Sequence, residues 1–293
     1  MAVVVGLAVG VVLGLAVGLV KAIDNGVMDL AALAALGPYF RLERLADGPA
    51  ADCADHDCAD HGLAAAPRET GWRPGLELAS ADGVDVLVGP VAHRMAARVP
   101  RPSELRRVAG STAHLSLVGR LLSPLLVLAS LDLAPAPELE QLWWRPPSGH
   151  GGDTGNIVDL AVSASTASRW LDGESGDGLP PSRRDWAEWV GTALLAPVAA
   201  AFEASGVPEQ TLLGNEAAAV RGALDALSVT SPATAARTTG PGVALLQSTR
   251  LAPTWTGTPF TPGFRRRSCC LVYRALPGER LVCGDCVLAR APA

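Results

Sequence analysis

Apolar positions recur along most of this chain at the spacing of amphipathic helices. Over residues 183–205 and 208–228 they fall at i, i+3 and i+4, which predicts two helices. Asn215 is expected to interrupt the second segment and to cap a new helix there. A shorter run with near-helical spacing, residues 28–36, stops at Gly37-Pro38, a pair that ends a helix. The pattern therefore predicts a predominantly helical protein.

A long apolar segment opens at Pro102-Ser103, where Ser103 is the expected N-cap of a further helix. His114 falls inside this segment. A lone histidine in an apolar helix is usually a core or boundary residue, so we interpret His114, and likewise His93, as structural.

Two short runs favour strands and add a β component. LEQLWW at 139–144 and NIVDLAVS at 156–163 are joined by a Gly- and Pro-rich loop, which predicts a hairpin carrying Trp143, Trp144 and His150. The tryptophans either form a wall of a ligand pocket or pack into the core. Residues 84–88 indicate either a strand or a buried stretch before a helix. The expected fold class is α+β, predominantly α-helical with a small antiparallel sheet.

Residues 1–20 form an apolar segment without a charged side chain, and a helix of that length spans the ~30 Å hydrocarbon core of a bilayer. Lys21, Arg41 and Arg44 follow it, so the positive-inside bias places the rest of the chain in the cytoplasm. The segment is either a membrane anchor or low-complexity sequence ahead of the true start. Four glycines spaced by four residues would share one face of a helix suited to close packing in lipid: Gly6, Gly10, Gly14 and Gly18.

Residues 47–80 are rich in Ala, Gly, Asp and Pro and predict a loop. The loop contains a tandem pentapeptide, DCADH repeated over residues 52–61, with Cys53 and Cys58. Cysteine and histidine together suit zinc, but an exact short duplication gives no regular chelate geometry, so we assign the repeat no site.

Composition and charge narrow the class of protein. A chain of 293 residues with 49% hydrophobic content can bury a sizeable core. The net charge of −5 offers no broad basic surface, so we expect no nucleic-acid partner.

Four of the six cysteines lie near the carboxyl end, as Cys269-Cys270, twelve residues, and then Cys283-Gly284-Asp285-Cys286. Adjacent cysteines bridge each other only with strain, and a chain with its own core needs no disulfide staples, so the spacing favours metal binding. Four thiolates can hold a zinc ion or an iron–sulfur cluster. Zinc sites usually use two C-x-x-C turns, and a Cys-Cys pair replaces one of them here.

Arginines crowd this region of the sequence. Cations near an iron–sulfur cluster favour its reduced state, although a charge run is often only a solvated surface or a patch for an acidic partner. Glu279 and Asp285 are the acidic residues that oppose them. The arginines are Arg265, Arg266, Arg267, Arg274, Arg280 and Arg290.

Five stretches of the chain resemble the ferric-siderophore reductase family of the FhuF type. Four of them are LAALGPYF at 33–40, GRLLSPLLVLASL at 119–131, LLGNEAAAVRGAL at 212–224 and FRRRSCCLVYR at 264–274. The fifth, CGDCVL at 283–288, completes with the Cys-Cys pair the most specific part of the likeness. The spacing between the pairs is ten residues in the family pattern and twelve here, and a loop absorbs two residues at little free-energy cost.

The resemblance implies a [2Fe-2S] cluster held by Cys269, Cys270, Cys283 and Cys286. It implies an oxidoreductase that passes one electron from this cluster to Fe³⁺ in a siderophore and releases Fe²⁺. The alternative is a siderophore-binding or assembly protein with a structural zinc site on the same four cysteines. The partners expected are a ferric siderophore, an unidentified electron donor and, if residues 1–20 are an anchor, the inner membrane.

These expectations divide the chain into three parts. Residues 1–20 are the apolar segment, residues 21–250 a siderophore-reductase-like helical domain with the loop at 47–80, and residues 251–293 the carboxyl-terminal [2Fe-2S]-binding segment, in which cysteines ligate the cluster.

Overall fold

A computed structural model describes residues 29–46, 71–99, 101–131, 133, 138–146, 158–171, 182–259, 263–275 and 283–288. The apolar segment 1–20, the repeat at 52–61 and the residues 276–282 between the two cysteine pairs lie outside these ranges. The interpretations of those segments stay predictions.

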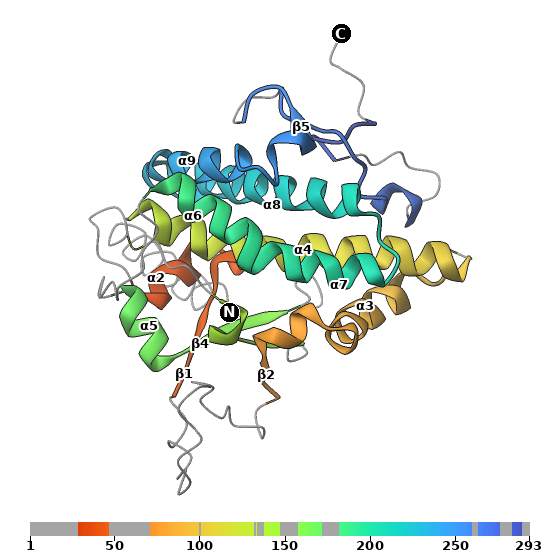
Figure 1. The fold of residues 1–293 in the computed structure, drawn as a ribbon, viewed down its shortest axis with the longest axis horizontal. Helices are drawn as coiled ribbons and strands as arrows, with labels where there is room; N and C mark the ends of the chain where they lie inside the picture. The colour runs from red at the N-terminus through yellow and green to blue at the C-terminus, as the bar shows by residue number, and fades with distance from the viewer. Residues whose placement is uncertain are drawn as a thin grey trace, which may run out of the picture.

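The body of the protein is built around one long helix, α4 (Pro102–Ser130), which crosses the molecule in Figure 1. α8 (Glu209–Thr230) packs along it, and α9 (Pro232–Leu246) contacts both. α3 (Ala81–Met95) packs against α4 as well. Most residues of α4 from Val108 onward are buried, because helices surround it.

α4 is the one helix among the described residues with the length and composition of a membrane span. Within the protein, however, 89% of its apolar window is buried. Its hydrophobicity is therefore accounted for by its place at the centre of the core.

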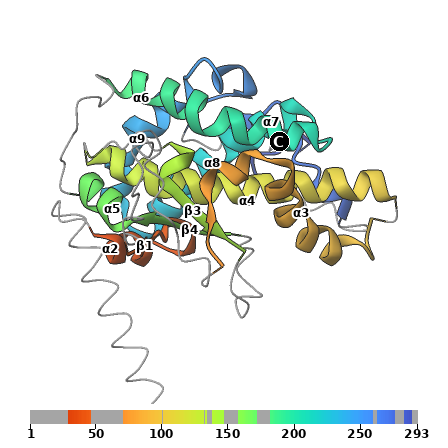
Figure 2. The same cartoon turned by 60° about the horizontal axis from the view of Figure 1, so that its bottom comes forward.

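The remaining helices cover the two sides of the pair formed by α4 and α8. α6 (Arg183–Trp189), a π-helical turn (Val190–Leu195) and α7 (Ala196–Ala204) form one continuous stretch, which confirms the helix predicted over 183–205. α2 (Leu30–Ala35) ends just before Gly37, as predicted. Figure 2 shows α6 and α7 on the opposite side of α4 from α2. α5 (Ala164–Leu171) follows the last strand of the larger sheet.

The small sheet predicted from the sequence is present and has four strands in the order β1-β4-β3-β2. β3 (Leu142–Arg145) and β4 (Asp159–Ser163) form the expected antiparallel hairpin. β2 (Arg73–Pro74) pairs antiparallel with β3, and β1 (Glu43–Leu45) adds to β4 as a parallel edge strand. A two-stranded sheet of β5 (Trp255–Thr256) and β6 (Arg265–Arg266) belongs to the carboxyl-terminal segment.

The tryptophans of the hairpin pack into the core. Trp144 is fully buried, and its indole N–H donates to the carbonyl of Pro74 at 3.1 Å. Trp143 is 7% exposed and packs on Trp72. Trp144 belongs to the main hydrophobic core and Trp143 to a small cluster with Trp72 and Ala161, so both pack into the interior, while His150 lies outside the described residues.

Several local predictions were wrong, each for a physical reason. Residues 84–88 lie inside α3, so the strand alternative is wrong, although Val84, Leu87 and Val88 are buried. The N-cap of α4 is Arg101, since Pro102 takes the first helical position. Asn215 lies inside an unbroken α8, where its side chain has a tertiary partner. The end of the loop predicted over 47–80 forms β2 and a 3₁₀ turn (Gly75–Ala79), and α9 was not predicted.

A buried arginine ties the amino-terminal residues to α4. Arg120 is 1% exposed, and its guanidinium donates to the carbonyls of Pro38, Arg41 and Val158. Burial lowers its pKa, and the three acceptors compensate for the lost water. This bonding fixes the 3₁₀ turn that contains Tyr39 (Pro38–Phe40) against α4.

Candidate metal centre

The two cysteine pairs are brought together by the backbone of the carboxyl-terminal segment. Cys269 and Cys270 come shortly after β6, and Cys283 and Cys286 lie in a turn closed by the Cys286 N–H, which donates to the Cys283 carbonyl at 3.0 Å. The N–H of Arg266 donates to the carbonyl of Asp285 at 2.9 Å and joins the two segments. This bond places the C-x-x-C turn beside the strand that leads to the Cys-Cys pair.

The four thiols are free and meet as two pairs, each with one member from either segment. The sulfurs of Cys270 and Cys283 are 3.7 Å apart. The side chain of Cys269 interacts with that of Cys286. Cys270 and Cys286 are buried, and Cys269 and Cys283 are partly exposed. The structure thus brings the four predicted side chains together as two pairs.

Backbone donors point at three of these sulfurs, and that of Cys270 accepts from the backbone of Val272. The N–H of Leu271 lies 3.3 Å from Cys269 Sγ, and the N–H of Leu288 lies 3.4 Å from Cys286 Sγ. In each case the donor is two residues beyond the cysteine. Hydrogen bonds to thiolate sulfur stabilise negative charge and tune the potential of iron–sulfur centres.

One arginine reaches the thiols. Arg266 is 2% exposed, its Nε lies 2.9 Å from Asp285 Oδ2, and its side chain also bonds to Cys270. The hydrogen bond with Cys283 and the charge of Arg266 lower the pKa of Cys270 to about 5. The same bond raises the pKa of Cys283, and burial raises the pKa of Cys269 to about 11. Among Cys269, Cys270 and Cys283, the thiolate form is therefore favoured at Cys270.

The other arginines of the run have different roles. Arg265 donates to the carbonyl of Gly284 at 2.7 Å, Arg274 pairs with Glu104 of α4 at 2.7 Å, and Arg267 is exposed. Arg280, Arg290 and Glu279 lie outside the described residues. Among the described arginines, Arg266 is therefore the one whose positive charge lies beside the sulfurs.

A buried polar seam attaches the cysteine segment to the helical core. Ser111 Oγ of α4 donates to the carbonyl of Cys270 at 2.7 Å, and the amide of Asn215 of α8 donates to Ser111 at 3.0 and 3.1 Å. Gly214 sits at a close approach, since a Cβ there would come within 2.1 Å of Ser268 Oγ. The sequence pattern gave no sign of the roles of Ser111 and Asn215, because their partners are distant in sequence.

His114 lies in the core, as predicted, although neither of its ring nitrogens has a hydrogen-bond partner among the described residues. It is fully buried, packs edge-on against Phe202 and has its Nε2 3.9 Å from a carboxylate oxygen of Glu216. Burial lowers its pKa to about 3, so it is neutral. Glu216 is also fully buried and accepts two hydrogen bonds from Arg250, at 2.7 and 2.8 Å. His93 is exposed on α3.

The donor set fits an iron–sulfur cluster. In the described part of the chain, no group of three or more His, Cys, Asp and Glu side chains surrounds one point as the ligands of a single metal ion would. The sulfurs instead lie two and two, and a two-iron cluster places two protein ligands on each iron. Soft thiolates are the ligands that such clusters take from proteins.

Comparison with known families bears on this segment. Residues 266–288 match the family described as the FhuF 2Fe-2S C-terminal domain. This segment is similar to a FhuF-type cluster domain. The match confirms the resemblance noted for the two cysteine motifs and covers all four cysteines and Arg266. Searches of curated proteins and of solved structures found no significant match to the chain.

Proposed function

We propose that the protein is a ferric-siderophore reductase that delivers one electron to siderophore-bound Fe³⁺. The observation that carries the proposal is the FhuF-type match over residues 266–288 at a site where four thiols meet in pairs. Cys269, Cys270, Cys283 and Cys286 would hold a [2Fe-2S] cluster. Such a cluster, when bound, takes up and releases single electrons.

The residues around the thiols adapt the site to this role. Four thiolates carry a large negative charge, which the buried Arg266 and the N–H groups of Leu271 and Leu288 offset. Ser111 and Asn215 hold the Cys270 backbone against α4 and α8. A rigid attachment of this kind keeps the reorganisation of the site on electron transfer small.

The chemistry of the substrate needs no acid–base residue. Fe³⁺ in the chelate gains one electron and becomes Fe²⁺, while no bond in the chelator breaks and no proton has to move. Hard oxygen donors bind Fe³⁺ far better than Fe²⁺, so the reduced iron is released. The electron comes from a one-electron carrier of the cell, which we propose to be a separate protein or cofactor.

Purification under anaerobic conditions tests the proposal. We expect a coloured protein with iron and acid-labile sulfide in equal amounts, and a return of the visible absorbance of the oxidised cluster when a ferric siderophore is added to the reduced protein with an Fe²⁺ trap. Cys283→Ser should lose the colour, while Cys53→Ser in the pentapeptide repeat should keep it. A colourless protein with one zinc ion would support the structural zinc site and refute the reductase.

The cytoplasmic location is part of the same proposal, since the arginines and lysine after residues 1–20 follow the positive-inside bias. Expression from Met28 tests the anchor. If the first 20 residues hold the protein at the membrane, the shortened chain should move to the soluble fraction, and unchanged membrane association would contradict this role.

A further inference from the structure

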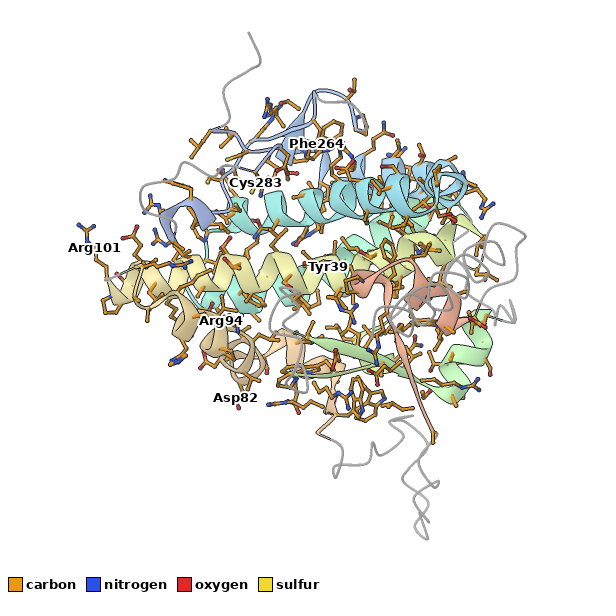
Figure 3. The ribbon with its side chains drawn as sticks, turned by 180° about the vertical axis from the view of Figure 1, so that it is seen from behind. Tyr39, Asp82, Arg94, Arg101, Phe264 and Cys283 are labelled. Carbon is orange, nitrogen blue, oxygen red and sulfur yellow. The ribbon has the colours of Figure 1, made fainter. Side chains whose placement is uncertain are left out.

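A groove runs along the contact between α4 and α8 and ends at the cysteine site. It consists of two adjoining cavities of about 500 and 590 Å³, which share Leu115 of α4 and Ala218 and Gly222 of α8. Tyr39 lies in the first cavity and Cys283 in the second. Figure 3 shows Tyr39 near α4 at the middle of the molecule, with Cys283 and Phe264 beyond α8.

The cavity at the Tyr39 end is an apolar trough. Its floor is made by small residues, so the two helices leave space between their side chains. The hydroxyls of Thr112 and Ser123 in its wall donate to carbonyls of their own helix and are not free donors for a ligand. Tyr39 and Phe40 form one side, and the floor consists of Gly119, Ala218, Ala219, Gly222, Ala223 and Ala226.

The cavity at the Cys283 end is lined by guanidinium groups. Arg266 pairs with Asp285 and Arg221 pairs with Asp225, so these charges are largely balanced. Arg265 donates to the Gly284 carbonyl and has no carboxylate within ion-pair distance in the described residues. Guanidinium groups only donate hydrogen bonds, so this end suits a ligand whose exposed atoms are oxygen acceptors.

We propose that this groove binds the ferric chelate, with its iron and oxygen donors beside Cys283 and an apolar arm in the trough. The inference rests on the reductase function proposed above and deepens it. Each cavity is within the size of small-molecule sites, and the division into an apolar part and a few polar donors is typical of them. The arrangement brings the iron next to a cysteine ligand, where the electron leaves the protein.

Gly222 allows the groove to be blocked without damage to the core. It is an exposed residue of α8 at the junction of the two cavities, and a Cβ there would meet no atom within 4 Å. Gly222→Leu therefore adds a side chain to the groove alone. Leucine also favours a helix over glycine, so the variant should fold at least as well as the wild type. Ala200→Leu, at an exposed position of α7 outside the groove, is the matched control.

The test uses the anaerobically purified holoprotein and redox-inert Ga³⁺ chelates. Two probes share one linear trihydroxamate head, and one of them carries an octanoyl arm. Calorimetric titration should show that the arm improves the affinity of the wild type by about tenfold or more, because apolar surface is buried in the trough. Gly222→Leu should abolish this advantage, and Ala200→Leu should keep it. Equal affinities of the two probes, or an advantage retained in Gly222→Leu, would overturn the proposal.

A second pair of variants tests the polar end. Arg265→Gln should weaken the binding of both probes by a similar factor, because both present the same oxygen donors. The exposed neighbour Arg267 is not part of the groove, so Arg267→Gln should leave binding unchanged. If the wild type and Arg265→Gln bound the probes equally well, the trihydroxamate head would not lie at this end of the groove.

The outcome for binding is separate from that for electron transfer. If Ga³⁺ chelates bind as described but Fe³⁺ chelates are not reduced, the groove stands and the reductase function fails. If Fe³⁺ chelates are reduced while the Gly222→Leu variant binds and reduces them normally, the function stands and the groove is wrong.

Discussion

Replacing Arg266 by Gln should lower the reduction potential of the proposed cluster. The Arg266 side chain is 1% exposed, forms an ion pair with Asp285 at 2.9 Å and bonds to Cys270. Its positive charge therefore acts through protein and not through water. Because the reduced cluster carries one more negative charge than the oxidised cluster, this cation favours reduction.

The size of the shift follows from Coulomb's law. Two unit charges ~4 Å apart interact by about 4 kcal/mol at an effective dielectric constant of ~20. This value is an upper limit, since the added electron spreads over atoms farther away than the Cys270 sulfur. For a one-electron couple, ~59 mV corresponds to a factor of ten in the equilibrium constant, so we expect a decrease on the order of 100 mV.

An anaerobic redox titration followed by visible absorbance measures this potential. Arg266→Lys keeps the charge and should retain most of the wild-type value, which separates charge from packing. Arg267→Gln removes an exposed charge from the same run and should shift the potential far less, because water screens it. Iron and sulfide content must be equal in all variants. A potential that is unchanged in Arg266→Gln, or equally lowered in Arg267→Gln, would refute the reasoning.

Two further predictions concern the buried titratable residues Glu216 of α8 and His114 of α4. Arg250→Met leaves the fully buried Glu216 without its partner and should destabilise the protein by about 3–5 kcal/mol in urea unfolding at neutral pH, whereas the double variant with Glu216→Gln should recover most of the loss. Additive losses would contradict this. His114 has a folded-state pKa of about 3, below its ordinary value of 6.5, so the unfolded chain takes up its proton first and stability should fall as the pH drops from 6.5 toward 3. The raised pKa of Glu216 has the opposite effect on stability, because the folded protein then takes up this proton before the unfolded chain does as the pH drops. His114→Phe should flatten the decline in stability above pH 5. An equally steep decline in this variant would exclude His114 as its source.

Much of the fold could be predicted because the core is amphipathic and periodic. The helices at 183–205 and 208–228 and the hairpin of β3 and β4 follow from local spacing, since one face of each must be buried. α9 was missed because its Thr, Gly and Pro residues hide the period. Asn215 was read as a cap because its local preference is for helix ends, but its partner Ser111 lies on another helix.

In the candidate site, too, one part could be predicted from the sequence and another could not. The four cysteines could be named from sequence alone, because soft ligands at close spacing have few other uses, and the family match over residues 266–288 agrees with them. The distinction among Arg265, Arg266 and Arg267 could not be made. Three adjacent arginines are equivalent in sequence, and only the pairing of β5 with β6 decides which of them is buried beside the thiols.

The sequence by itself therefore determined which groups this protein offers for chemistry, a set of four thiols on a mostly helical chain. The tertiary structure decided which residues surround the thiols. Residues from 33–40, 119–131, 212–224, 264–274 and 283–288 all line the groove between α4 and α8. They meet because small residues on both helices leave a trough, while Arg120 and the Ser111–Asn215 bonds hold Tyr39 at one end and the cysteines at the other. Such contacts depend on the packing of distant segments, which no local pattern records.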